Sequence, residues 1–291
     1  MYYVLFGVLY AASLLPLKVL YLLSDFAYVV VYYLFGYRND VVMQNLTIAF
    51  PQKTEDEKIK IAKQFYKNFC DTFIETIKFI SASSTFFEKR FKADFSVLNE
   101  AFALGRPVQI QAGHNFNWEL VNLAVPKYLD GTLVGVYLPL NNKIFERLFR
   151  YIRSRFGTQL IAATRMREEM FRYRGKHYFI GLIADQAPPV PQKAYWVNFF
   201  GRPTAFLRGP ENAARISNYS VVFTHFRKSK RGYYEGAAEL CTTTPRELPE
   251  GHLTLLYAHY LERVMSAHPE MWLWSHRRWK HEWKEEYGII E

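Results

Sequence analysis

The first 36 residues are almost entirely apolar, and this run limits what the chain can fold into more than any other feature. Lys18, Ser24 and Asp25 interrupt it. No basic residue precedes the run and it is too long for a secretory signal, so we expect a retained membrane segment over residues 1–36. Pro16 should divide it into two helices, at about 2–15 and 17–36, because proline interrupts a helix.

The way in which this segment meets a membrane stays open. A charge at Asp25 would be costly at the depth of a bilayer, so an interfacial hairpin fits nearly as well as a single span. A very apolar helix pair in a soluble protein is the third alternative. The tyrosine-rich flanks favour the interface, and the charges from Arg38 onward favour a cytoplasmic position for the main domain, residues 37–291.

The next segment has the pattern of a long amphipathic helix. Thr54 and Glu57 have the spacing of a capping box, which predicts a helix over about 54–80. Apolar side chains then recur every fourth position, at Ile61, Phe65, Phe69, Phe73 and Ile77. We interpret this stripe as a core-facing surface.

Strand-like and helix-like patterns alternate through the rest of the chain. The expected strands are 107–112, 131–139, 158–163 and 177–185, and the expected helices are 117–129, 142–157, 164–176 and 251–267. A hairpin is expected over 220–240. This alternation predicts an α/β fold in which a mostly parallel, mixed central sheet is flanked by helices.

The charge balance indicates an anionic partner. The formal net charge is +10, and the stretch 143–178 is strongly basic. Nucleic acid, an anionic membrane surface and an acidic carrier or substrate all fit such a surface, as does a basic surface that only maintains solubility. The membrane segment and the lack of a nucleic-acid motif argue against nucleic acid. Cys70 and Cys241 have no metal-site spacing and suit free thiols, although one disulfide is an alternative.

The stretch GHNFNWE, residues 113–119, places a histidine and a carboxylate between an expected strand and an expected helix. If Gly113 turns the chain, Asn115 or Asn117 caps the helix and Glu119 lies in its first turn, then Glu119 can reach His114. A carboxylate on one imidazole nitrogen leaves the other free to take a proton from a hydroxyl. No G-x-S-x-G motif supplies a nucleophile, so the hydroxyl should belong to a substrate. A buried histidine that only caps a loop is the alternative.

Several motifs in order resemble the late acyltransferases of lipid A biosynthesis, within the glycerolipid acyltransferase group that has an H-x4-D/E motif. GHNFNWE is similar to the G-H-x-x-N-W-E/D signature of that family. The other matching stretches are NDVVMQNLTIAFP (39–51), RSRFG (153–157), ADQAPP (184–189), VNFFGRPTAF (197–206) and HPEMWLWSHRRWK (268–280).

The resemblance implies an acyltransferase that works at the cytoplasmic face of the inner membrane, with an acyl carrier protein thioester as donor, a glycolipid precursor of lipid A as acceptor, and no cofactor or metal. It makes His114 the general base and Glu119 its orienting partner. Arg153 and Arg155 become candidates for binding substrate charge, or else lie on a solvated helix face. Asn117, Asp185 and Gln186 are further substrate-binding candidates, with structural support the alternative for Asp185 and Gln186.

Leu138 departs from the family, whose members often carry Arg or Lys at that position. This keeps a second acceptor open, an aminolipid or a lysophospholipid, with the same chemistry. A non-catalytic membrane-binding protein with a relic site is the alternative of another class, and the intact His114 and Glu119 argue against it.

Overall fold

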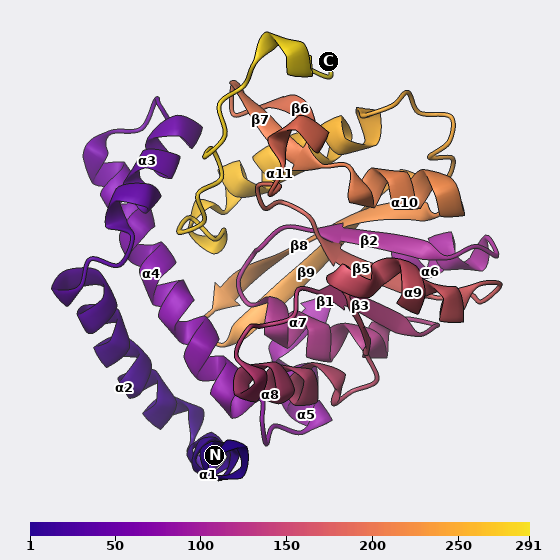
Figure 1. Ribbon diagram of the computed structural model, residues 1–291. Coiled ribbons are helices and arrows are strands. Elements are labelled where there is room, and N and C mark those ends of the chain that lie inside the picture. Colours follow the sequence, from indigo (N-terminus) through magenta and orange to yellow (C-terminus); the bar gives the residue numbers. More distant parts are fainter.

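The computed structural model describes residues 1–291 and is built on a seven-stranded sheet (Figure 1). The strand order is β1-β9-β8-β2-β5-β3-β4, and only β8 and β9 pair antiparallel. The strands are β1 (Phe91–Ala93), β2 (Val108–Ala112), β3 (Leu133–Tyr137), β4 (Gln159–Ala162), β5 (Phe179–Ile183), β8 (Ser220–Lys230) and β9 (Tyr233–Thr242). The predicted mixed, mostly parallel sheet is therefore confirmed.

The central strand β2 is buried at every position and pairs in parallel with both β5 and β8. In its register with β5, Ala112 lies opposite Ile183. Parallel strands end at the same edge of a sheet, so the residues that follow β2 and β5 emerge side by side. In open α/β sheets, ligands bind at this carboxyl edge.

Helices cover both faces of the sheet, with α10 and α11 on one side and α5, α7 and α8 on the other in Figure 1. The helices after the N-terminal pair are α3 (Asn39–Ala49), α4 (Glu55–Lys78), α5 (Ser84–Arg90), α6 (Ser96–Ala103), α7 (Trp118–Ala124), α8 (Lys143–Ser154), α9 (Met166–Met170), α10 (Gly209–Ser217) and α11 (His252–Ala267). A separate antiparallel ribbon consists of β6 (Ala194–Phe199) and β7 (Arg202–Leu207).

The expected helix over 164–176 is confirmed as helical over residues 163–173, but it is not a single α-helix. It consists of a 3-10 turn at Ala163–Arg165, the one-turn helix α9 and a second 3-10 turn at Phe171–Tyr173. None of its residues is fully buried, so little packing supports a longer helix.

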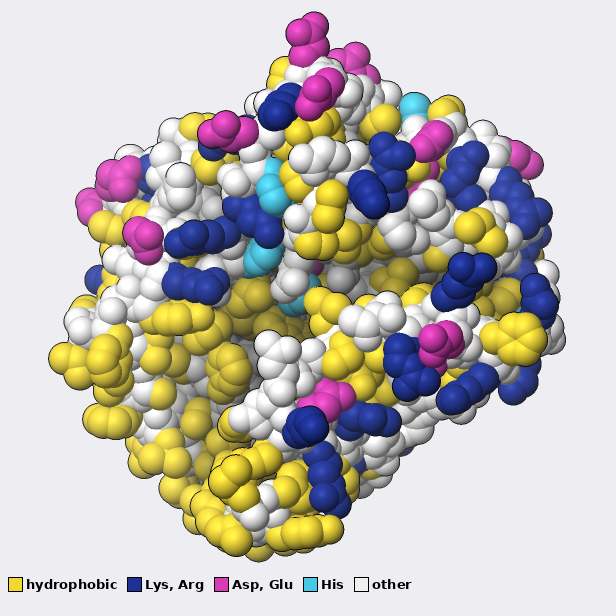
Figure 2. Space-filling model, viewed as in Figure 1, with side chains coloured by type: hydrophobic (Ala, Val, Ile, Leu, Met, Phe, Trp, Pro, Cys, Tyr) yellow, Lys and Arg dark blue, Asp and Glu magenta, His cyan; other side chains and the backbone are white.

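The apolar N-terminal segment forms α1 (Tyr2–Leu14) and α2 (Leu17–Tyr28), with the predicted break at Pro16. A π-helical stretch, Val29–Leu34, continues α2, and together they are long and apolar enough to cross a membrane. The side chains of Val19, Leu22, Leu23 and Phe26 lie exposed along one face of α2. Figure 2 shows hydrophobic side chains gathered over the lower left of the molecule, where Figure 1 places α1 and α2.

The other face of α2 is bonded to the rest of the chain. Asp25, whose charge would be costly in a bilayer, forms an ion pair with Arg231 (2.6 Å) at the turn between β8 and β9. Lys78, at the end of α4, donates to the carbonyl oxygens of Ser13 (2.8 Å) and Leu15 (3.1 Å) and so fixes the link between α1 and α2. The N-terminal helices are thus bonded to α4 and to the β8–β9 hairpin.

Helix α4 begins with the predicted capping box of Thr54 and Glu57, but its aromatic stripe is only partly core. Phe65 is fully buried, whereas the Phe73 side chain is 53% exposed. Four residues turn a helix by about 400°, so a four-residue repeat drifts around the axis by about 40° at each step. The expectation of a continuous core stripe was therefore wrong.

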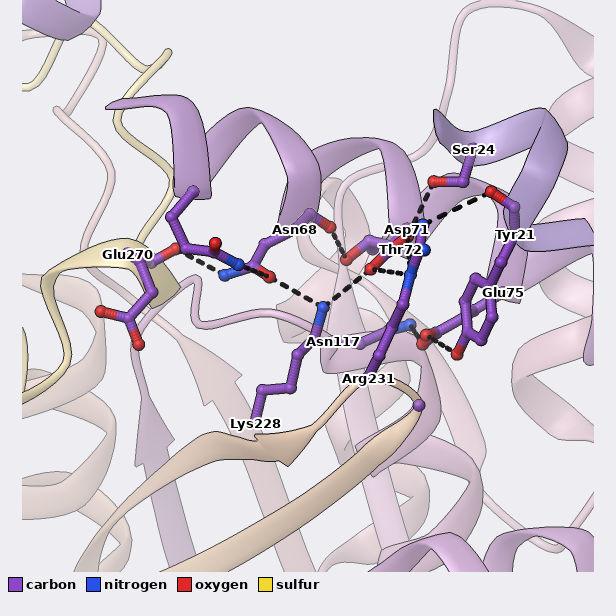
Figure 3. Close-up of polar contacts among 12 residues, drawn as sticks. Tyr21, Ser24, Asn68, Asp71, Thr72, Glu75, Asn117, Lys228, Arg231 and Glu270 are labelled. Atoms are coloured by element: carbon purple, nitrogen blue, oxygen red, sulfur yellow. Dashed lines mark hydrogen bonds and ion pairs between the residues drawn. The ribbon is translucent and has the colours of Figure 1, made fainter. Parts of the chain in front are cut away.

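Polar residues lie at the buried positions of α4 that the aromatic stripe does not reach, and Figure 3 shows their hydrogen-bond network. Asp71 accepts hydrogen bonds from Ser24 (2.7 Å) of α2 and from Lys228 (3.0 Å) and Arg231 (2.7 Å) of the β8–β9 hairpin. Burial alone would raise the pKa of Asp71, but the bonds and charges of Arg231 and Lys228 lower it. The charged carboxylate therefore joins α2, α4 and the hairpin.

We expect Arg231→Ala to destabilise the protein, because it leaves Asp25 unpaired and Asp71 buried with one cation fewer. Breaking a buried pair costs about 3 kcal/mol, which corresponds to a fall in Tm of roughly 5 °C or more for a chain of this size. Thermal unfolding in detergent measures it. Arg227→Ala is the matched control, because Arg227 pairs with Glu235 on the exposed face of the same hairpin and its loss should cost less than about 1 kcal/mol. Equal losses in the two variants would contradict the structural role of Asp71.

Candidate active site

The site lies at the carboxyl edge of the sheet, where β2 and β5 end. Gly113 follows β2, and its α-carbon is closely surrounded: a β-carbon there would lie 2.9 Å from Leu261 and 3.2 Å from the Asp185 carboxylate. Only glycine fits this approach without displacing its neighbours. The turn brings His114, after β2, against Asp185, after β5.

Asp185 holds His114 at two points. The backbone N–H of His114 donates to Asp185 Oδ2 (2.8 Å), and the ring Nδ1 forms a short hydrogen bond with Asp185 Oδ1. The indole N–H of Trp272 also donates to Oδ2 (2.6 Å). Burial alone would raise the pKa of Asp185, but the His114 ring and these hydrogen bonds lower it to about 2. An ionised Asp185 therefore places the ring proton on Nδ1.

The second ring nitrogen of His114 is then an acceptor. Its Nε2 lies 3.1 Å from Gln186 Nε2, and the Gln186 amide can donate to it. The His114 side chain is 17% exposed, so the ring is not sealed inside the core. The arrangement has the orientation that a general base needs, with a carboxylate on one nitrogen and a lone pair on the other.

Asn117 begins α7, as one of the two predicted caps. Its side-chain oxygen accepts from the backbone N–H of Leu120 (3.2 Å), and its amide donates to Glu75 Oε2 (3.0 Å) on α4. Glu75 also accepts from Tyr21 (2.7 Å) and Tyr234 (2.8 Å) (Figure 3). Asn117 is completely buried, so it fixes the loop that carries His114.

Glu119 lies in the first turn of α7, as expected, but the expected contact with His114 is absent. Its carboxylate is buried and bonded to Arg153 of α8, whose Nε lies 2.9 Å from Glu119 Oε2. Burial would lower the pKa of Arg153, but the hydrogen bonds and the charge of Glu119 raise it. The helix directs residue 119 toward α8, while the neighbouring strand presents Asp185 to the imidazole. Asp185, and not Glu119, is therefore the carboxylate that holds the ring.

The two candidate arginines have different surroundings. Arg153 is largely buried beside Glu119, within 5.1 Å of the Phe149 ring centroid. Arg155 points elsewhere: its guanidinium bonds the carbonyl oxygen of Phe79 at the end of α4 and lies over the Phe156 ring. The structure thus brings together His114, Asp185 and Gln186. It bonds Asn117 to Glu75, joins Glu119 to Arg153, and places Arg155 in a helix-to-helix contact.

Residues from the C-terminal segment complete the site. Trp272 supports Asp185, and His276 Nε2 accepts from the backbone N–H of Ala187 (3.0 Å), next to Gln186. Burial and the Arg278 charge lower the pKa of His276 to about 4, so it is a neutral acceptor at pH 7. The HPEMWLWSHRRWK motif marked this segment, but no local pattern showed that it would reach the ends of β2 and β5.

The surroundings of the site are hollowed and basic. In Figure 2, histidine side chains line a depression near the centre of the molecule, with lysine and arginine side chains around it. Leu138, at the carboxyl end of β3, is 64% exposed. No group of three or more His, Cys, Asp or Glu side chains could hold a metal ion.

Comparison with known proteins agrees with the motifs. The family model described as bacterial lipid A biosynthesis acyltransferase matches residues 1–281, which is nearly the whole chain. A comparison with curated protein sequences finds no match. The motifs that match in order, the α/β fold and the family model support one conclusion: this chain is an acyltransferase that belongs to the bacterial lipid A biosynthesis acyltransferase family.

Proposed function

We propose that this protein transfers a fatty acyl chain from an acyl carrier protein thioester to a hydroxyl of a lipid A precursor, with His114 as the general base. The observation that carries the proposal is the bond between His114 Nδ1 and Asp185, which leaves Nε2 as the acceptor nitrogen of a partly exposed ring. In the protein without substrate, Gln186 is hydrogen-bonded to this nitrogen. That bond must break before the acceptor hydroxyl can bind there.

The reaction then balances without an enzyme-bound acyl group. His114 Nε2 takes the hydroxyl proton as the oxygen attacks the thioester carbonyl. The tetrahedral intermediate collapses, the carbon–sulfur bond breaks, and the imidazolium returns its proton to the leaving thiolate. The products are an ester and the free thiol of the carrier. The ionised Asp185 stabilises the positive charge that the ring carries in between.

Glu119 and Arg153 act as one unit in this proposal. Their buried ion pair joins the first turn of α7 to the end of α8 on the side of the site next to His114. Because the guanidinium stays charged, it can stabilise the oxyanion or a phosphate of the acceptor. Arg155, bonded to a main-chain carbonyl, supports the placement of α8.

The exposed apolar face of α1, α2 and the π-helical stretch is proposed as the membrane-bound surface, residues 1–36, with the catalytic domain, residues 37–291, on the cytoplasmic side of the inner membrane. The bonds of Ser24 and Asp25 to the catalytic domain favour helices that lie against the domain in the interface over a free single span.

We expect His114→Ala and Asp185→Asn to lower kcat strongly with little change in KM for the acyl donor. Loss of the base should cost about 10³-fold, and loss of the ring orientation roughly 10²- to 10⁴-fold. Steady-state transfer from a purified acyl carrier protein thioester measures both variants, with Tm as the check on folding. Near-normal transfer by a folded His114→Ala protein would remove His114 from the mechanism.

Glu119 and Arg153 generate a separate prediction. Glu119→Gln or Arg153→Gln alone leaves one charge buried without its partner, which should cost about 3 kcal/mol of stability, whereas the double variant should recover part of that loss. Transfer by the double variant should be no lower than that of the worse single variant, because the pair acts as a unit. Additive losses in a double-mutant cycle would mean that the two side chains act independently.

The acceptor has one serious alternative, an aminolipid or a lysophospholipid. The exposed Leu138 favours it, because an apolar side chain stands where family members often carry a cation. Mass spectrometry of lipid A and phospholipids from cells with and without the gene should show that lipid A loses one acyl mass, restored by the wild-type gene and not by His114→Ala. Unchanged lipid A together with a deacylated aminolipid or phospholipid would identify the alternative acceptor.

A further inference from the structure

A second basic site lies away from His114, between α5, β1 and the end of the β8–β9 hairpin. The pocket has a volume of about 350 Å³ and is lined by four cationic side chains, one carboxylate and three hydroxyl side chains: Lys89, Arg90, Lys92, Lys230, Glu235, Ser229, Tyr233 and Tyr234. Three elements contribute to it: α5 and β1 on one side and the hairpin on the other.

These cations have no carboxylate partners. No ion pair involves any of the four, and Arg90 donates only to the carbonyl oxygen of Gly232 (3.0 Å). The acidic residues nearby are already occupied: Glu235 pairs with Arg227, and Glu88 pairs with Lys127. Like charges held together repel one another, so the cluster carries an uncompensated positive potential.

Aromatic side chains hold two of the cations in place. The Tyr233 ring centroid lies 4.7 Å from the guanidinium of Arg90 and 4.1 Å from the Lys230 nitrogen. Arg90 also lies 4.6 Å from the Phe86 ring centroid. Cation–π contacts of this kind restrict the side chains before any ligand binds. The cluster therefore resembles a preorganised anion-binding site more than a set of flexible surface side chains.

The pocket adjoins the N-terminal helices. A side chain at Gly232, between Lys230 and Tyr233, would collide with Tyr21 of α2 and with Arg90. Arg231, in the same turn, pairs with Asp25 of α2. Lys78 is a fifth nearby cation, and burial together with the Arg90 charge lowers its pKa while it holds the α1–α2 link. The positive potential is therefore concentrated where the apolar face of α2 begins.

We propose that this pocket binds the phosphate headgroup of an anionic phospholipid in the membrane that holds α1 and α2. Basic side chains next to a membrane segment attract anionic lipid. The aromatic rings among the cations suit the headgroup layer. The bound lipid would tie the hairpin and α5 to the same leaflet as α2. This site is independent of the acyl transfer proposed above.

The test uses the full chain in a non-ionic detergent and native mass spectrometry with added phosphatidylglycerol or phosphatidylcholine. The wild type should retain one phosphatidylglycerol with at least about tenfold preference over phosphatidylcholine. Lys89→Gln/Lys92→Gln/Lys230→Gln should lose that preference. The matched control, Arg167→Gln/Arg172→Gln/Arg174→Gln, removes the same charge from exposed residues around α9 and should keep it.

Each other outcome has a defined meaning. Equal retention of phosphatidylglycerol by the two triple variants would overturn the proposal. Binding of inorganic phosphate without any preference for phosphatidylglycerol would identify a free phosphate site and overturn the lipid source. An unchanged lipid preference with a raised KM for the acyl carrier protein thioester would make the cluster a carrier-docking surface. The triple pocket variant should keep its kcat and its Tm, because the cations it removes have no carboxylate partners. A lowered Tm would indicate a structural role and contradict the proposal.

Discussion

Two carboxylates buried on α4 hold the molecule together. Asp71 bonds the second N-terminal helix to the β8–β9 hairpin, and Glu75, one turn later, bonds the same helix to Tyr234 and to Asn117. Burial raises the pKa of Glu75, although Lys228 and the Tyr21 hydrogen bond oppose the shift. A buried carboxylate without these partners would cost several kcal/mol, so the fold is stable only when helix, hairpin and site loop are all in place.

The histidine–carboxylate pair follows from sheet topology. His114 and Asp185 are 71 residues apart, yet the parallel register of β2 with β5 brings their backbones to the same edge. Each residue lies two positions beyond the end of its strand, so strand pairing fixes the geometry of their backbones. Trp272, from a third part of the chain, then fills a remaining acceptor position on Asp185. The geometry of the candidate site depends on long-range pairing more than on the local motif.

This dependence explains what could be predicted from the sequence. Local signals located the capping box at Thr54, the break at Pro16, the cap at Asn117 and the strand before Asp185, although that strand is buried only at its first two positions, because each depends on neighbouring residues only. The partner of His114 could not be found in the same way. H-x4-E brings Glu119 near His114 in the chain, but a helix start turns that carboxylate toward α8, where Arg153 is a stronger partner. The β6–β7 ribbon was also missed, since its strands pair with each other outside the main sheet.

The apolar N-terminal helices and the site are mechanically continuous as a result. Tyr21 of α2 and Asn117 of the site loop bond the two oxygens of one Glu75 carboxylate. A rotation of α2 would therefore have to break a buried hydrogen bond or move α4 with it, and both changes are costly in a packed interior. The orientation of the His114 loop relative to the apolar face of α2 is thus set when the chain folds. An enzyme that acts on a lipid benefits from this arrangement, because its acceptor also has a fixed orientation in the membrane.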